Sequence, residues 1–254
     1  MKGKFSVIIA SFNHALFLKD AIRSVFSQSN CYLEILIVDD GSTDGSRELI
    51  STLVAEHGDL IRLLVHPGEV NRGIAETYWL AMTMASGEYL AFLEPDDHWG
   101  DNYLSNKLSI FQRLPEVNVV FSPCAVITEG TLGMEMSMRQ WLLGLAIPRQ
   151  QAIDCFTSML RRNAIATFSA FCVRRSAVIE MPMPPSRTTH FVDWWMLLLL
   201  SSNGPFFLDP HSLVHWRQRP DSALRRRNFS LLKADLIGFF EYSASHFQLR
   251  AGSL

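Results

Sequence analysis

Three carboxylates stand within four residues, at Glu94, Asp96 and Asp97. They directly follow residues 88–93, an apolar run that is predicted to form a strand. Carboxylates this close together repel one another unless a cation or a hydrogen-bond donor compensates them. Hard oxygen ligands of this kind suit Mg²⁺ or Mn²⁺, which take a few carboxylates together with phosphate oxygens. An ordinary surface turn has the same composition, so this motif alone leaves both interpretations open.

A second acidic pair, Asp39-Asp40, follows the apolar run at residues 33–38 and opens the turn sequence DDGSTD. An aspartate in such a turn either caps a helix or accepts hydrogen bonds from a bound ligand, such as a nucleoside base or ribose. We expect one residue of the segment 42–44 to cap the helix that follows.

Alternating elements must position these side chains. Strand-like runs at residues 5–9, 33–38, 60–65, 88–93 and 117–121 alternate with helical patterns, for example at 18–26, 73–85 and 102–113. This alternation predicts an α/β fold with a mostly parallel, twisted sheet and helices on both faces. Ligands of such sheets bind at the carboxyl ends of the strands. We therefore expect the polar clusters at 11–13, 39–44 and 94–97 to meet at one edge of the sheet.

The alternation weakens after about residue 125. Residues 130–144 are rich in Met and Gly and are predicted to form a mobile loop or lid. Helices are expected at 151–161, 190–202 and 230–247, and strands at 168–173 and 213–218. The predicted organisation is a nucleotide-binding half at 1–98, an acceptor-facing half at 99–220 and a helical C-terminal tail at 221–254.

Composition limits the class of protein. The 254 residues carry a net charge of −2, which argues against nucleic acid as the main partner. Four scattered cysteines are typical of reduced thiols in a cytosolic protein. The longest apolar stretch, at 194–200, is far shorter than the roughly 20 residues of a membrane span. We expect a cytoplasmic protein, and peripheral contact with the inner face of a membrane stays open for the terminal helix and for the arginines at 225–227.

Six segments taken together are more specific than any one of them. VIIASFN (7–13), ILIVDDGSTD (35–44), NRGI (71–74), ASGEYLAFL (85–93), EPDDHW (94–99) and FVDWWML (191–197) resemble, in order and spacing, the family 2 inverting glycosyltransferases. The resemblance covers about residues 4–220. It implies the GT-A fold and transfer of a hexose or amino sugar from a nucleotide-diphosphate donor, commonly a UDP-sugar. The implied acceptor is a hydroxyl of a saccharide or lipid-linked saccharide, in polysaccharide or surface glycan synthesis.

The resemblance also implies roles for individual residues. Asp193, which precedes a tryptophan, is the expected catalytic base. Asp96 and Asp97 are the expected ligands of a divalent cation, Mn²⁺ or Mg²⁺, that bridges the donor phosphates. The expected donor-binding residues are Ser11, Asn13, Asp39, Asp40, Arg72, Glu94, Asp96 and Arg219.

The sequence departs from the family pattern at several of these positions. Glu94 replaces the first aspartate of the acidic motif, and Val192 replaces a glutamate before the expected base. Arg219 stands where the family often has a metal-binding histidine. A guanidinium cannot ligate a metal but can contact a diphosphate.

These departures keep an alternative function open, namely a nucleotide-sugar-binding module that has lost catalysis. Two other classes of enzyme fit less well. No GxGxxG follows the first predicted strand, which argues against a dinucleotide-dependent dehydrogenase. The segment SFNHALF (11–17) is neither glycine-rich nor strongly basic, as the phosphate loop of a sugar-phosphate nucleotidyltransferase would be.

Overall fold

A computed structural model describes residues 4–29, 31–128, 131–133, 151–163, 165–184, 191–219 and 229–247. Most of the predicted lid at 130–144 and the arginines at 225–227 lie outside this part of the chain.

The first half of the chain follows the predicted alternation closely. Its elements are β1 (Lys4–Ser11), α1 (Leu18–Phe26), β2 (Tyr32–Asp39), α2 (Ser46–His57), β3 (Ile61–Val65), α3 (Ile74–Met84) and β4 (Tyr89–Phe92). β1 and β2 are buried on both faces over most of their length, which explains why their sequences are continuous apolar runs.

The helix cap predicted within residues 42–44 is wrong. The N-cap of α2 is Gly45, with φ +90° and no side-chain cap. The side chains of Ser42 and Asp44 accept hydrogen bonds from Asn13 N and Ala15 N in the loop after β1, and Asp44 Oδ1 also accepts from Ser46 N at the start of α2, at 3.0 Å. The polar turn is therefore used mainly to join two strand ends.

The second half contains shorter elements. They are β5 (His98–Trp99), α4 (Tyr103–Arg113), β6 (Val119–Phe121), β7 (Cys124–Thr128), β8 (Thr131–Gly133), α6 (Phe156–Arg161), β9 (Phe171–Arg174), α7 (Val192–Ser202), β10 (Phe206–Leu208), β11 (Val214–Gln218) and α8 (Phe229–His246). The predicted strand at 168–173 begins as a 3-10 turn, Phe168–Ala170, and the predicted helix at 151–161 shortens to its last six residues. β5, β7, β8 and β10 were not predicted, because runs of two to five residues carry little periodicity.

Within the described residues the strands form two sheets. The larger has seven strands in the order β10-β6-β9-β4-β1-β2-β3 and is parallel except for β9, which runs antiparallel to β4 and β6. This confirms the predicted mostly parallel sheet. The smaller has four strands in the order β5-β11-β7-β8. It begins just after the acidic motif, because β5 starts at His98.

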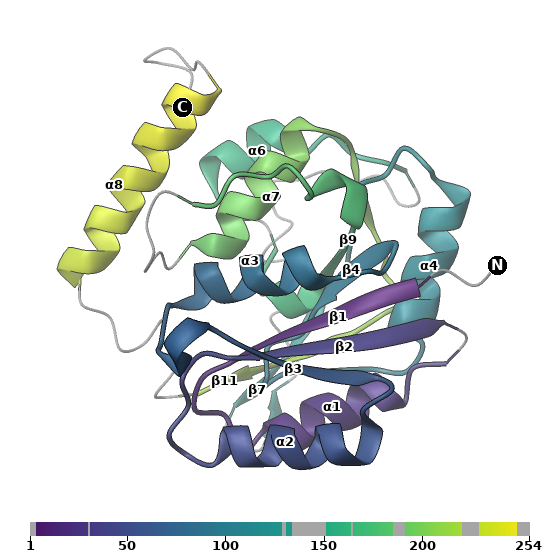
Figure 1. Cartoon of the computed structure of the whole chain (residues 1–254). Coiled ribbons are helices and arrows are strands. Elements are labelled where there is room, and N and C mark those ends of the chain that lie inside the picture. The colour runs from purple at the N-terminus through teal and green to yellow at the C-terminus, as the bar shows by residue number, and fades with distance from the viewer. Residues whose placement is uncertain are drawn as a thin grey trace.

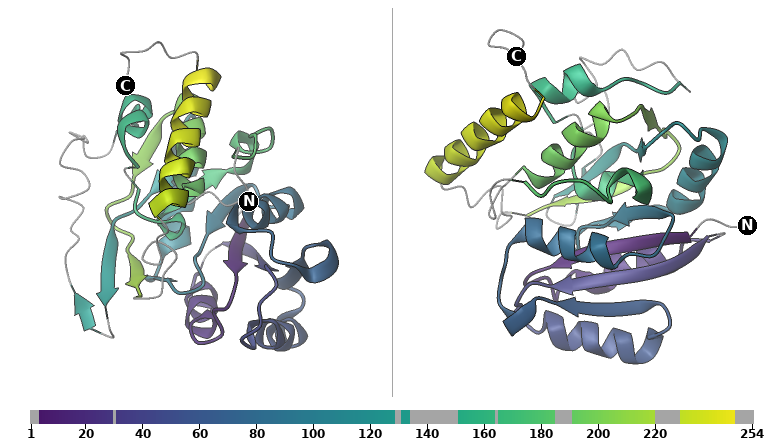
Figure 2. Two further views of the ribbon diagram at one scale, coloured as in Figure 1. Left: turned by 90° about the vertical axis from the view of Figure 1, so that its left-hand side faces the viewer. Right: turned by 45° about the horizontal axis from the view of Figure 1, so that its top comes forward.

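Helices cover both faces of the larger sheet. In Figure 1, α1 and α2 lie below β1, β2 and β3, whereas α3 crosses above them. Both views of Figure 2 show α8 leaning on α7, on the side of the molecule away from α1 and α2. No helix in the described part of the chain has the length and apolar character that crossing a bilayer requires.

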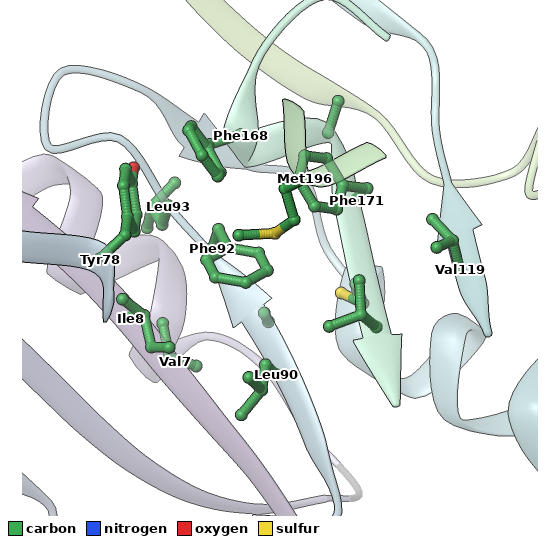
Figure 3. Packing of buried hydrophobic residues seen from close by; sticks show 14 of the residues in the cluster. Val7, Ile8, Tyr78, Leu90, Phe92, Leu93, Val119, Phe168, Phe171 and Met196 are labelled. Carbon is green, nitrogen blue, oxygen red and sulfur yellow. The ribbon is translucent and has the colours of Figure 1, made fainter. Parts of the chain in front are cut away.

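An aromatic core lies beneath the carboxyl ends of β1 and β4. The ring of Tyr78, on α3, stacks on Phe168 with centroids 4.0 Å apart, and Phe92 packs against both rings. Figure 3 shows Phe92 between Ile8 of β1 and Met196 of α7. The core thus ties α3, β4 and α7 together directly under the acidic motif.

The terminal helix α8 packs on the same core from outside. Phe239 is buried and its ring centroid lies 4.4 Å from that of Trp194, while Tyr242 contacts Trp195 edge-on at 4.7 Å. In the described residues, α8 therefore covers apolar side chains of the domain's own core.

Candidate functional site

The three predicted polar clusters do meet at one edge of the sheet. β1 pairs in parallel with both β2 and β4, which brings the carboxyl ends of all three strands together. Asp40 N donates to Ser11 O at 2.8 Å, and Thr43 N donates to Asn13 Oδ1 at 2.8 Å. Asn13 takes a left-handed conformation, φ +59°, which an asparagine tolerates better than most residues. The loops after β1 and β2 are therefore locked to each other.

Two polar side chains at this edge are buried with an unpaired atom. Ser11 and Asp39 are register partners at the ends of β1 and β2 and are 1% and 0% exposed. Ser11 Oγ and Asp39 Oδ1 have no hydrogen-bond partner, whereas Asp39 Oδ2 accepts from Ser42 N at 3.2 Å and from Arg47 Nε at 3.0 Å. A buried polar atom without a partner costs about 1–3 kcal/mol. Such atoms at a strand end indicate a site where a ligand supplies the missing bonds.

Asp40 is engaged differently from Asp39. Its two carboxylate oxygens accept from the backbone N–H groups of Arg72, at 2.6 Å, and Gly73, at 2.9 Å. Burial raises the pKa of Asp40, and these two donors oppose that rise. The Arg72 side chain is exposed, so the contact uses only its main chain. Asp40 fastens the loop before α3 to the end of β2. Contacts of Asp40 and Arg72 with a nucleotide-sugar stay predictions.

A glycine is required where these loops cross. Gly41 has φ +78°, and a Cβ on it would come within 2.9 Å of Asn71 N. Any larger residue would separate the turn after β2 from the loop that Asp40 holds.

Ser169 links the carboxylates of the acidic motif to the 3-10 turn that precedes β9. Its Oγ accepts from Glu94 N at 2.9 Å and donates to Asp97 Oδ2 at 2.6 Å. Asp97 also accepts from Thr167 Oγ1 at 3.3 Å and, through Oδ1, from Arg217 N at 2.9 Å. Burial, and then the charge of Asp96, raise the pKa of Asp97 to about 7. Asp97 therefore connects the acidic loop to two other segments of the chain.

Glu94 is held from the opposite side by Tyr78. The Tyr78 hydroxyl donates to Glu94 Oε1 at 2.6 Å. Burial raises the pKa of Glu94 to about 8, and the charges of Asp96, Asp97 and Asp193 add to this rise. At neutral pH the Glu94 carboxyl is therefore mostly protonated, and its proton is available as a hydrogen-bond donor.

Asp96 forms an ion pair with Arg219, the residue that directly follows β11. Arg219 Nε lies 2.9 Å from Asp96 Oδ2, and the two side chains are about equally buried, at 16% and 15% exposed. The neighbouring Arg217 donates from Nε to the main-chain oxygen of Asp96 at 3.0 Å. Both guanidiniums lie over the ring of Phe17, at 5.0 and 4.9 Å from its centroid. Two positive groups are thus fixed beside the acidic motif.

The expected base, Asp193, lies in the first turn of α7. Its Oδ1 accepts from Trp194 N at 2.7 Å, and its Oδ2 accepts from Asn163 Nδ2 at 2.9 Å. Burial raises the pKa of Asp193 to about 6, although these two donors oppose the shift. The charge of Asp193 contributes to the raised pKa of Glu94, so the two carboxyls belong to one cluster. A carboxylate with a pKa near 6 is mostly ionised at pH 7 and is a stronger base than an ordinary aspartate.

The acidic motif fits a divalent cation poorly as it stands. In the described part of the chain no three His, Cys, Asp or Glu side chains converge on a common point. Glu94 and Asp97 are bonded to Tyr78, Ser169, Thr167 and Arg217 N, and Asp96 is paired with Arg219. A metal on Asp96 and Asp97, as the sequence led us to expect, would compete with Arg219 for Asp96 and with the hydrogen-bond donors that already engage both oxygens of Asp97.

Several residues of the site have no signal in the sequence. Ser169 and Asn163 contact their carboxylate partners across 72 and 30 residues, from short segments without periodicity. Arg47 had a usable signal, since it stands eight residues after Asp39 at the start of a predicted helix. The residues not anticipated are His14, Phe17, Arg47, Tyr78, Asn163, Thr167, Ser169 and Arg217.

The sequence model described as glycosyl transferase family 2 matches residues 6–180 of the chain. The chain belongs to glycosyl transferase family 2. A relative from Campylobacter jejuni, GalNAc(5)-diNAcBac-PP-undecaprenol beta-1,3-glucosyltransferase, is 32% identical over 143 residues, which are 53% of this chain and 42% of that protein. The chain spans between about a third and three fifths of the length of the curated relatives that it matches.

Solved structures of other glycosyltransferases share the fold of this family 2 chain. The mannosyltransferase PcManGT from Pyrobaculum calidifontis, in complex with GDP-Man and Mn²⁺, matches with a TM-score of 0.65 and 16% identity over 96% of this chain and 65% of that chain. S. aureus TarS 1-349 in complex with UDP-GlcNAc matches with the same TM-score and identity, over 98% and 73%. The fold is therefore GT-A, as the sequence predicted.

Proposed function

We propose that this family 2 chain binds a nucleotide-diphosphate sugar, with a UDP-sugar as the first candidate, at the carboxyl ends of β1, β2 and β4. It transfers the sugar to an acceptor hydroxyl with inversion at the anomeric carbon. The acceptor is a saccharide or a lipid-linked saccharide, in the synthesis of a polysaccharide or surface glycan. The name of the Campylobacter relative, which acts on an undecaprenol-linked saccharide, supports this class of acceptor.

The unpaired atoms at the ends of β1 and β2 carry this proposal. Ser11 Oγ, Asp39 Oδ1 and Arg47 Nη2 are all buried without a partner, and they lie together because Ser11 pairs with Asp39 and Arg47 binds Asp39. These atoms include both hydrogen-bond donors and acceptors, so a ligand that fits them must offer both kinds of group. A nucleoside base or a ribose does so. The nucleoside therefore binds here, with Asn13 shaping the loop beside it.

The transfer step uses Asp193. As the acceptor oxygen bonds to the anomeric carbon, Asp193 takes the hydroxyl proton, and the bond from that carbon to the diphosphate oxygen breaks. The electron pair of the broken bond leaves with the diphosphate. One displacement of this kind inverts the anomeric configuration. The hydrogen bonds from Asn163 and Trp194 N hold the carboxylate in place for the reaction.

The alternative function, a binding module without catalysis, predicts a different result at Asp193. We would incubate the protein with UDP- and GDP-sugars and an undecaprenyl-diphosphate-linked saccharide, and measure both nucleotide release and glycosylated lipid. The proposal expects transfer, and expects Asp193→Asn to slow it by about 10²–10⁴-fold with nucleotide binding unchanged. Tight nucleotide binding without transfer in any combination would favour the module, and transfer at the full rate by Asp193→Asn would remove Asp193 as the base.

A further inference from the structure

The ion pair between Asp96 and Arg219 lies between two strand ends of the candidate donor site. Asp96 belongs to the loop after β4, and Arg219 follows β11. The same guanidinium also contacts the loop after β1, through a 3.1 Å contact between its NH2 nitrogen and His14 Nε2 and through the face of Phe17. Because β1 and β4 are neighbours in the sheet, the guanidinium lies between the loops that follow these two strands.

The contacts to Arg219 make it a preorganised cation. A carboxylate, an imidazole nitrogen and an aromatic face hold one planar group from three directions, and its side chain is only 16% exposed. A guanidinium presents five N–H donors in a fixed fork, which matches the geometry of phosphate oxygens. A partly buried arginine held in this way loses little freedom when an anion arrives.

A divalent cation would compete with this guanidinium for Asp96. Each other carboxylate of the motif is already bonded, Glu94 to Tyr78 and Asp97 to Ser169. A metal would therefore have to share the Asp96 carboxylate with Arg219 or displace the guanidinium, and breaking a buried ion pair is costly. Arg217, fixed to the main chain of Asp96 and to the same Phe17 ring, adds a second positive charge at the point where phosphates would come.

We infer that Arg219 is the resident cation for the donor diphosphate, so that nucleotide-diphosphate binding by this chain does not require a divalent metal. The inference rests on the proposed donor site and differs from the expectation of Mn²⁺ or Mg²⁺ on Asp96 and Asp97. Asp96 positions Arg219, the ring of Phe17 packs against the guanidinium, and Arg217 adds a second positive charge beside it.

Isothermal titration calorimetry with UDP and with GDP, each in EDTA and in Mn²⁺, tests the inference on the purified chain. The wild type is expected to bind one nucleotide with a Kd that changes less than about twofold between the two buffers. Arg219→His removes the guanidinium, frees Asp96 and supplies an imidazole that can ligate a metal. Its binding is expected to weaken by about tenfold or more in EDTA and to recover in Mn²⁺.

Two further variants complete the experiment, one as a control and one as a second test. Arg23→His makes the same substitution on the exposed face of α1 and is expected to behave as the wild type. Arg219→Lys keeps the charge without the fork, and is expected to bind in EDTA with intermediate affinity. It also tests the inference if Arg219→His fails to fold, which circular dichroism would show.

Three results would overturn the inference. Loss of wild-type binding in EDTA, with recovery in Mn²⁺, would show that the chain depends on a metal. Metal-independent binding that is unchanged by both Arg219 variants would show that another group carries the diphosphate. Folded wild-type protein that binds neither nucleotide in either buffer would remove the proposed function itself, and this outcome differs from the first two.

Discussion

Asn163 Nδ2 donates to Asp193 Oδ2 at 2.9 Å, and this bond orients the carboxylate that we propose as the catalytic base. The same amide accepts from Ile165 N through Oδ1 at 3.1 Å, which fixes which end of the amide faces the aspartate. Val192, at the position before Asp193, is 1% exposed and packs in the core. The base is therefore oriented by a side chain from a separate segment together with the main chain of Trp194, and not by the side chain of the residue before it.

Asn163→Ala is expected to move the acid limb of the pH–rate profile upward. The hydrogen bond from Asn163 lowers the pKa of Asp193 against the larger effect of burial, and the resulting value is about 6. Removing a donor to a carboxylate favours the protonated form by about 1.5–3 kcal/mol, which corresponds to about one to two pH units. The base must be deprotonated to act, so the midpoint of the acid limb moves from about 6 to about 7–8 and the variant loses activity at and below neutral pH. A profile that keeps its wild-type midpoint while kcat falls would assign Asn163 a purely structural role.

Ser11→Ala is expected to separate stability from binding. Ser11 Oγ is buried without a partner, so its removal should leave the free energy of unfolding unchanged or raise it by up to about 1 kcal/mol. If that hydroxyl binds the nucleoside, the Kd for the nucleotide rises by about tenfold. Urea unfolding and calorimetry measure the two effects. Ser109→Ala, on the exposed face of α4, is the matched control. A clear loss of stability with unchanged nucleotide binding would remove Ser11 from the site.

The strand ends and their polar side chains could be predicted because the signal is local. A continuous apolar run followed by Asp39 or by Glu94 marks the end of a buried parallel strand, and parallel strands end at one edge. What each carboxylate does there could not be predicted. Asp39 and Asp40 are adjacent in sequence and of the same type, yet one keeps an unpaired oxygen and the other is bonded on both.

The partners that decide these roles come from distant segments. Arg219 reaches Asp96 across more than a hundred residues, and Ser169 reaches Asp97 from a 3-10 turn of three residues. Neither segment has a periodic pattern that would place it against the acidic motif. The sequence therefore predicted the strand ends and the carboxylates of the candidate site, whereas the tertiary structure was needed to find the groups that compensate them.

A buried ion pair between Lys107 and Asp209 is expected to be a sensitive point for stability. Lys107 Nζ lies 2.8 Å from Asp209 Oδ2, both side chains are at most 1% exposed, and the pair joins α4 to the loop that leads into β11. Burial lowers the pKa of Lys107, and the Asp209 charge opposes this. Lys107→Met leaves the aspartate buried without its cation, at a cost of about 3–5 kcal/mol.

The double variant Lys107→Met/Asp209→Leu removes both charges and is expected to be more stable than Lys107→Met alone. Urea denaturation of wild type, the two single variants and the double variant gives the coupling energy. If the two single effects simply add in the double variant, the ion pair contributes no interaction of its own.

His98 and His215 make the stability of the smaller sheet depend on pH. The two residues are register partners on β5 and β11, and their rings stack 4.4 Å apart at an angle of 9°. Burial lowers the pKa of both below 6.5, and the charges of His215 and Arg217 lower that of His98 further. Below pH 6.5 the unfolded chain therefore binds more protons than the folded chain, so this pair loses stabilisation as the pH falls.

Buried carboxyls in the site have raised folded-state pKa values, so their contribution to stability increases as the pH falls, opposite to that of the histidines. The measurement must therefore compare variants. His98→Phe keeps a stacked aromatic ring but cannot be protonated. Its free energy of unfolding, measured in urea at pH 7.5 and at pH 5.5, is expected to fall less over this interval than that of the wild type. Since the carboxyls are present in both proteins, their contribution cancels in the difference. An equal pH dependence in the two proteins would show that the stacked histidines stay neutral without cost, and would contradict the assignment.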